Sequence, residues 1–83
     1  MHNAMLNHVW TIEGPRSAGG DEIHVYAYQN GAMIGMLDGQ LCGRDFQLRM
    51  AYVSPAWRGS RVMRDMFVAL KRQYNWMLLR RRR

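Results

Sequence analysis

The chain has 83 residues and one cysteine, and its 12 Lys and Arg against 6 Asp and Glu give a formal net charge of +6. This length indicates one small domain, 1–83. Because Cys42 is the single cysteine, the chain has neither an internal disulfide nor the cysteine spacing of a zinc finger. The sequence contains no run of about 18 apolar residues, so no transmembrane helix is expected. The chain does not open with a signal-peptide pattern. We expect a soluble, intracellular protein without a membrane partner, located in the cytoplasm or, if a phage encodes it, in the host-cell cytoplasm or the virion.

The positive charge is concentrated near the C-terminus. Residues 58–83 contain nine Lys and Arg and one acid, whereas residues 1–57 contain three arginines and five acids. This asymmetry favours an anionic partner for the last third of the chain, whether a nucleotide phosphate, a nucleic acid or an acidic protein surface. The candidate contact is the basic tail, 80–83, formed by Arg80, Arg81, Arg82 and Arg83. A solvated tail without a partner is the alternative.

The segment 1–21 is predicted to hold an N-terminal strand and a loop. Residues 1–12 show no firm period, although the sequence Val-Trp-Thr-Ile at 9–12 favours a strand. Residues 14–20, Gly-Pro-Arg-Ser-Ala-Gly-Gly, have the composition of a loop.

The core, 22–79, begins with a predicted β-hairpin. Residues 22–29 alternate so that Ile23, Val25 and Ala27 share one face. Asn30 and Gly31 are typical of a type I′ turn. The returning strand starts at residue 32 and either stops near residue 37 or restarts to residue 41. Gly35 within it indicates a bulge or a close approach of another segment.

A third strand and a helix follow the hairpin. Residues 46–53 predict a strand with Phe46, Leu48, Met50 and Tyr52 on one face. Pro55 ends this strand. A helical period then runs from residue 60 or 61 to about 74, with Ser60 as a plausible N-cap. Its apolar face comprises Met63, Met66, Phe67, Leu70 and Tyr74.

Residues 76–79 predict a short final strand before the basic tail. The complete order indicates an α+β fold, in which an antiparallel β-meander is followed by a crossover helix and a strand parallel to the one before it.

The junction of the third strand and the helix, Val53-Ser54-Pro55-Ala56-Trp57-Arg58-Gly59, carries the most specific signal. A strand, a tight loop and a helix N-terminus together direct unpaired backbone N–H groups at one point, which suits an anion. The spacing from Val53 through Pro55 to Arg58-Gly59 resembles the acyl-CoA-binding signature of the GCN5-related N-acetyltransferases (GNAT). The resemblance covers about residues 22–80, the central half of a full-length family domain, and indicates a short, degenerate member.

The resemblance implies a partial acyl-CoA N-acyltransferase fold that binds acetyl-CoA and acetylates an amine. It places the pantetheine against the backbone of Tyr52 and Val53, and the pyrophosphate against the backbone amides of 58–63. The implied cofactor-binding residues are Tyr52, Val53, Arg58, Gly59, Ser60, Arg61, Val62 and Met63.

Two departures from the family pattern bear on the chemistry. Arg61 and Met63 occupy positions where the family has glycine or alanine. The glutamate that serves some members as general base aligns near Gln47, and an amide cannot accept a proton. No catalytic residue is therefore assigned.

The remaining candidates have structural alternatives. His2, His8 and His24 lack metal-ligand spacing and are expected to be structural or exposed. Cys42 is expected to be a small buried hydrophobe rather than a reactive thiol. Aromatic residues that either stack on nucleobases or pack in the core are Tyr26, Tyr28, Trp57 and Trp76.

Three functions remain open. The first is an acetyl-CoA-dependent N-acetyltransferase. The second is a catalytically degenerate relative that acts as a binding, inhibitory or structural protein with a protein partner or as a homo-oligomer, for example a phage accessory or virion component. The third is a basic nucleic-acid-binding module.

Overall fold

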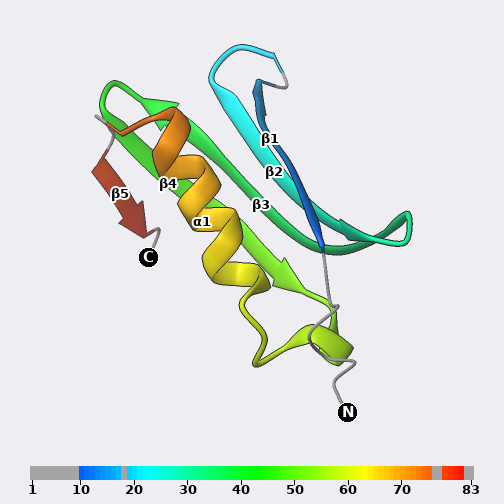
Figure 1. Ribbon diagram of the computed structural model, residues 1–83. Coiled ribbons are helices and arrows are strands. Elements are labelled where there is room, and N and C mark those ends of the chain that lie inside the picture. Colours follow the sequence, from blue (N-terminus) through cyan, green and yellow to red (C-terminus); the bar gives the residue numbers. More distant parts are fainter. Residues whose placement is uncertain (1–9, 18, 76–77, 82–83) are drawn as a thin grey trace.

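The computed structural model describes residues 10–17 and 19–75, together with the backbone of 78–81. One helix lies against one face of a five-stranded sheet with the strand order β1-β2-β3-β4-β5 (Figure 1). The elements are β1 Thr11–Ser17, β2 Glu22–Gln29, β3 Ala32–Cys42, β4 Asp45–Val53, the 3₁₀ turn η2 Pro55–Trp57, α1 Val62–Gln73 and β5 Leu78–Arg81. β1 to β4 are antiparallel and β5 is parallel to β4. The predicted α+β meander with a crossover helix is confirmed.

The loop prediction for 14–20 is wrong at its start, because β1 continues through Ser17. β1 pairs with β2 on both sides of a register shift between Glu13 and Arg16. Gly14 lies in this irregular stretch with φ +97°, and a Cβ there would be 2.7 Å from the carbonyl oxygen of His24. Glycine is therefore required by the pairing as well as by the backbone conformation. The part of the predicted strand before residue 10 lies outside the described residues.

The predicted hairpin is confirmed. Gln29 pairs with Ala32 across a two-residue turn, and the φ angles of Asn30 and Gly31 are 52° and 80°, the positive values that a type I′ turn requires. The predicted inward face of β2 is also buried. β3 does not stop at Leu37 but runs without interruption to Cys42. Cys42 is exposed, which contradicts the expected burial, because it lies at the end of β3 next to the turn into β4.

Gly35 meets both expectations for a glycine within a strand. The register between β2 and β3 shifts beside it, where Ala27 pairs with Gly35 but Tyr28 pairs with Met33. A Cβ at Gly35 would be 2.9 Å from Met66 Cε and 3.0 Å from a methyl carbon of Val62. The missing side chain thus lets α1 approach the sheet closely.

The predicted face of β4 is wrong for its second half, because the strand contains a β-bulge. Asp38 pairs with Met50 but Gly39 pairs with Leu48, so Arg49 is the extra residue. Phe46 is fully buried under α1, whereas Met50 and Tyr52 are 49% and 37% exposed. The extra residue reverses the alternation, so that Met50 and Tyr52 lie on the face opposite the helix and Val53 is buried.

The core lies between α1 and the sheet. Helix residues Val62, Met66 and Leu70 are fully buried, and the predicted members Met63, Phe67 and Tyr74 pack against them in partly buried positions. The predicted face was therefore largely right but omitted Val62, which occupies the turn that approaches Gly35.

The start of the helix differs from the prediction by one residue. The N-cap is Arg61 rather than Ser60. The Ser60 hydroxyl nevertheless accepts a hydrogen bond of 3.2 Å from the backbone N–H of Val62, the first helical residue. Ser60 thus satisfies one of the amides that a helix start leaves free.

β5 extends beyond residue 79, the predicted end of the final strand. It spans Leu78–Arg81 and pairs in parallel with residues 45–48 of β4. The backbone of Arg80 and Arg81 therefore belongs to the sheet, while residues 76–77 and 82–83 lie outside the described part. None of the described helices is long and apolar enough to cross a membrane.

Candidate functional site

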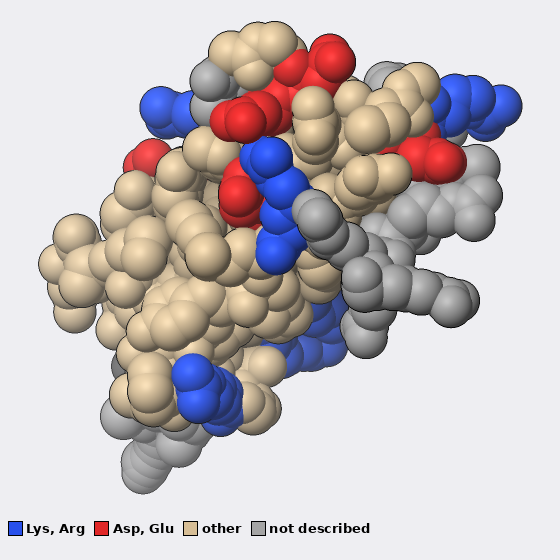
Figure 2. Space-filling view, turned by 180° about the vertical axis from the view of Figure 1, so that it is seen from behind, with Lys and Arg blue, Asp and Glu red and all other residues tan. Residues whose placement is uncertain are grey.

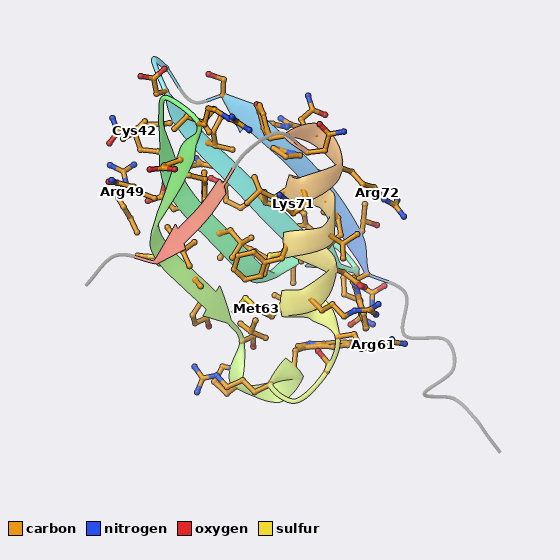
Figure 3. All side chains as sticks on the ribbon, turned by 90° about the vertical axis from the view of Figure 1, so that its left-hand side faces the viewer. Cys42, Arg49, Arg61, Met63, Lys71 and Arg72 are labelled. Carbon is orange, nitrogen blue, oxygen red and sulfur yellow. The ribbon has the colours of Figure 1, made fainter. Side chains whose placement is uncertain are left out.

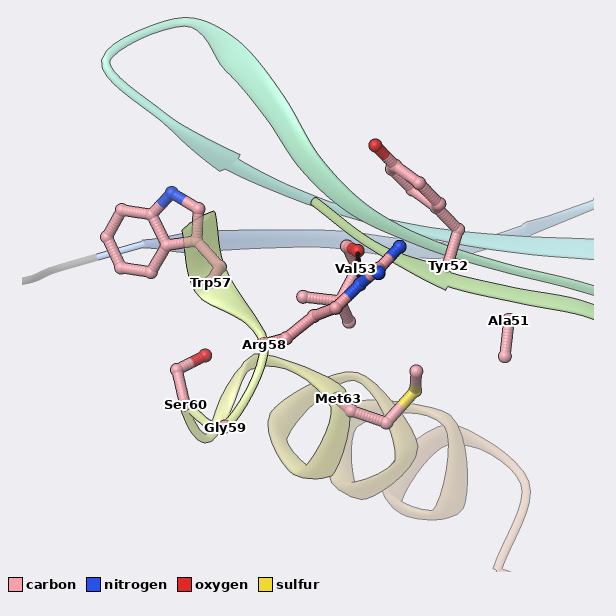
Figure 4. Close-up of a pocket in the computed structure, with 8 residues that line it drawn as sticks. All are labelled: Ala51, Tyr52, Val53, Trp57, Arg58, Gly59, Ser60 and Met63. Atoms are coloured by element: carbon pink, nitrogen blue, oxygen red, sulfur yellow. Dashed lines mark hydrogen bonds between the residues drawn. The ribbon is translucent and has the colours of Figure 1, made fainter. Parts of the chain in front are cut away.

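A pocket of about 400 Å³ opens between the end of β4 and the start of α1 (Figure 4). Its lining comes from one continuous stretch of chain that leaves the sheet, passes through η2 and enters the helix. The lining residues are Ala51, Tyr52, Val53, Trp57, Arg58, Gly59, Ser60 and Met63. Arg58 is the one charged residue among them, so the pocket is electropositive. Of the predicted site residues, all but Arg61 and Val62 line it.

The backbone amides of the loop alternate between paired and unpaired. Arg58 N–H donates to the carbonyl oxygen of Pro55 over 3.3 Å, and Ser60 N–H donates to that of Trp57 over 3.1 Å. The amides of Gly59, Arg61 and Met63 have no acceptor among the described residues. Gly59 has φ +87°, a conformation that favours glycine. The loop therefore presents free N–H groups at the positive end of α1.

The side chain of Arg58 folds back over the end of β4. Its Nε donates a hydrogen bond of 3.0 Å to the carbonyl oxygen of Val53 (Figure 4). This carbonyl is one of the two backbone positions expected to contact pantetheine. In the structure one of its two lone pairs already accepts a hydrogen bond from the guanidinium, so a ligand donor must use the other lone pair or displace Arg58.

Met63 and Val62 occupy very different environments, although they are adjacent. Met63 is partly buried and extends from α1 toward β4 inside the pocket (Figure 4). Val62 is fully buried in the core, so only its backbone can contribute to a site. Arg61 is exposed as the N-cap and lies outside the pocket lining. Of the two residues that replace glycine or alanine of the family pattern, Met63 therefore enters the pocket and Arg61 does not.

β4 is only half paired on the side of β5. Parallel pairing covers Asp45 to Leu48, and from Arg49 onward no described strand pairs with that edge of β4. The bulge at Arg49 lies where the pairing stops. The two strands thus leave an open edge that leads directly to the pocket.

The fold is similar to that of solved acetyltransferase structures. One is a PaiA N-acetyltransferase from Thermoplasma acidophilum in complex with coenzyme A, with a TM-score of 0.63 and 13% identity over 66% of this chain and 35% of that chain. Another is AAC(6′)-Iy in complex with a bisubstrate analogue, CoA-S-monomethyl-acetylneamine, with a TM-score of 0.62 and 16% identity over 76% of this chain and 51% of that chain. The chain has a GNAT-like fold.

A third structure, a putative acetyltransferase of the GNAT family from Desulfovibrio desulfuricans, agrees, with a TM-score of 0.60 and 16% identity over 66% of this chain and 37% of that chain. This chain therefore spans between about a third and a half of the length of these GNAT structures. No protein-family model and no curated protein matches the sequence.

The lining of the pocket contains no His, Asp, Glu, Lys or Cys side chain that could serve as a general base. Gln47 is exposed on β4, pairs with Arg80 of β5 and lies outside the lining. The described residues also contain no group of three His, Cys, Asp or Glu side chains that could hold a metal ion. His2 and His8 lie outside the described part, and His24 lies on the sheet face opposite α1.

Proposed function

We propose that this chain binds acetyl-CoA at the pocket between β4 and α1 and transfers the acetyl group to an amine. The observation that most directly supports this proposal is the set of unpaired amides at Gly59, Arg61 and Met63, next to a cationic side chain and an open strand edge. Free N–H groups at a helix N-terminus are suited to a pyrophosphate. The fold shared with coenzyme A-bound acetyltransferases supports the same ligand.

The residues present fit this ligand after two local movements. Arg58 would turn away from the carbonyl oxygen of Val53, so that its whole guanidinium can pair with a phosphate. Met63, an unbranched side chain with several rotatable bonds, must turn away from the pocket. Acetyl-CoA would supply an acetyl thioester whose carbonyl carbon a neutral amine can attack.

Calorimetric titration of acetyl-CoA into the purified protein tests the proposal. We expect saturable binding, and we expect Arg58→Ala to weaken it about tenfold, equivalent to ~1.4 kcal/mol. Arg44→Ala is the matched control, because it removes the same charge at the exposed turn between β3 and β4, away from the pocket. Absence of binding at millimolar acetyl-CoA would contradict the proposal. Binding without acetyl transfer to any amine would favour the catalytically degenerate alternative.

A second candidate function is nucleic-acid binding along the exposed side of α1. A groove of about 620 Å³ there is lined by Arg64, Phe67, Val68, Lys71, Arg72 and Asn75. Lys71 and Arg72 project from the helix near its C-terminal end (Figure 3). Three cations beside an apolar floor suit a phosphate backbone with a stacked base.

A gel-shift titration of labelled single-stranded DNA at several salt concentrations tests the second candidate. We expect affinity to fall as salt rises and to be lost in Arg64→Glu/Arg72→Glu. Arg16→Glu/Arg44→Glu, with the same charge change away from α1, should bind nearly as the unaltered protein does. Equal losses in the two double variants would show a response to net charge only.

A further inference from the structure

The sheet face opposite α1 carries a connected set of polar side chains that the proposed pocket does not use. His24 Nε2 lies 2.9 Å from Asp38 Oδ1, and the Tyr26 hydroxyl lies 3.1 Å from His24 Nδ1. A carboxylate can only accept, so Nε2 carries the ring proton of neutral His24 and Nδ1 accepts the hydrogen bond from Tyr26. The three groups form a chain from carboxylate to imidazole to phenol, which we call the relay.

The relay is held in place by a second layer of charged residues. Arg49, the bulge residue of β4, contacts Asp38 Oδ1 at 3.4 Å and Glu22 Oε2 at 3.3 Å. The hydrogen bond to Glu22 raises the pKa of the Arg49 guanidinium above its usual value. The side chains of His24 and Asp38 are only 26% and 23% exposed. The bulge thus places the Arg49 guanidinium beside the Asp38 carboxylate, which in turn orients His24.

The other charged groups beside His24 come from β1. Arg16 is the cross-strand partner of His24, and Arg16 Nη2 pairs with Glu13 Oε1 at 3.5 Å. This pair is internally neutral. The two carboxylates Glu22 and Asp38 exceed the single guanidinium of Arg49 by one charge when His24 is neutral. The local field around the relay therefore favours a cation.

Cross-strand pairing connects the relay to the candidate pocket. Tyr26 pairs with Met36, and Met36 pairs with Tyr52, which lines the pocket. In the next row, His24 pairs with Asp38, and Asp38 pairs with Met50. Two strand spacings of ~4.8 Å place His24 about 10 Å from the open edge of β4. On this sheet face, the side that Figure 2 views, Met36, Met50 and Tyr52 lie next to one another on β3 and β4 and form an apolar surface.

We propose that this face binds the amine acceptor and that His24 accepts its proton through Tyr26. This proposal rests on the proposed acetyl transfer. The acceptor class is a primary amine carried on an apolar body, because the ammonium would meet the excess negative charge of the relay and the body would cover Met36 and Met50. The attacking nitrogen would then stand between His24 and the open edge of β4.

The proton and bond changes balance without another reactant. One proton of the bound ammonium passes to the Tyr26 oxygen while the Tyr26 hydroxyl proton passes to His24 Nδ1, and a neutral amine is left. The amine nitrogen bonds to the thioester carbonyl carbon as the carbon–sulfur bond breaks. The departing thiolate keeps the bonding electron pair and takes the second proton of the nitrogen. Asp38 is a positioning residue, because it acts through the tautomer and orientation of His24.

The first test needs no catalysis. Phenethylamine is titrated into the protein while the imidazole signals are followed by nuclear magnetic resonance, and the His24 signal is identified by its loss in His24→Gln. We expect phenethylamine to shift the His24 signal in a saturable way, and also in Tyr28→Phe, which removes a hydroxyl from the same face without touching the relay. A His24 signal unaffected by millimolar phenethylamine overturns the proposal, whether or not acetyl-CoA binds.

The second test measures acetylation of phenethylamine against pH. We expect His24→Gln to lower kcat/KM by at least 100-fold while the calorimetric Kd for acetyl-CoA stays unchanged. Asp38→Asn should change the pH dependence of kcat/KM, which a purely structural role would leave unchanged. Tyr26→Phe keeps the ring and provides a milder variant if His24→Gln fails to fold. A His24→Gln protein with unaltered kcat/KM overturns the assignment of the base. If the unaltered protein does not bind acetyl-CoA, that result refutes only the proposed function.

Discussion

Arg58 and Val53 are joined by a hydrogen bond of 3.0 Å from the guanidinium Nε to the backbone carbonyl oxygen. The bond closes the turn between β4 and α1 on itself and occupies one backbone acceptor of the candidate pocket. The same arginine therefore holds the free form of the loop and is the cation available to an incoming phosphate. Its two roles predict separate effects on stability and on ligand binding.

Arg58→Ala should lower the free energy of unfolding by about 1 kcal/mol, because the Val53 carbonyl loses its donor. Urea denaturation followed by tryptophan fluorescence measures this change. Arg64→Ala, which removes the same charge from the exposed side of α1, should change stability by less than about 0.5 kcal/mol. Equal effects of the two substitutions would show that the hydrogen bond does not stabilise the loop.

Met63→Ala should tighten acetyl-CoA binding several-fold, because it removes the side chain that extends into the pocket. Calorimetric titration measures the change in Kd. Met33→Ala is the matched control, since Met33 is 43% exposed and does not line the pocket. Weaker binding in Met63→Ala would mean that Met63 contacts the ligand rather than obstructing it.

Gly39→Ala should be more destabilising than Gly35→Ala. A Cβ at Gly39 would lie 2.5 Å from the backbone oxygen of Gln47, which cannot move without disturbing β4. A Cβ at Gly35 would first meet the flexible end of Met66. Thermal and urea unfolding should show a loss of about 1–3 kcal/mol for Gly35→Ala and a larger loss for Gly39→Ala. The reverse order would be inconsistent with the packing described.

Trp10 and Asp65 connect the start of β1 to the first turn of α1. Trp10 Nε1 donates a 2.7 Å hydrogen bond to Asp65 Oδ2, and the Trp10 ring meets Trp57 edge-on with centroids 5.7 Å apart. Trp10→Phe should lower the free energy of unfolding by about 1–3 kcal/mol, because the Asp65 carboxylate loses this hydrogen-bond donor.

A double-mutant cycle separates the Trp10–Asp65 bond from the burial of the Trp10 ring. The cycle with Asp65→Ala, followed by urea denaturation, should give a coupling energy of at least 0.5 kcal/mol. Additive losses would show that the ring matters and the bond does not.

Sequence alone determined the elements whose signals are local. The alternation in 22–29, the Asn-Gly turn and the helical period after residue 60 each depend on neighbouring residues, and the structure confirms them. Most of the candidate pocket was predictable for the same reason. Its lining comes from the short stretch 51–63, so local sequence signals predict the strand, the turn and the helix that form it.

Tertiary structure decided what depends on pairing between distant segments. The bulge at Arg49 moved Met50 and Tyr52 to the face opposite α1, since one unpaired residue reverses every later side chain of a strand. Pairing with β2 turned a loop-like sequence at 14–17 into strand. Register between β2 and β3 also brought His24 beside Asp38, which local sequence periods do not predict. Side-chain direction follows from sequence only while the register is unbroken, and only the folded sheet fixes the register.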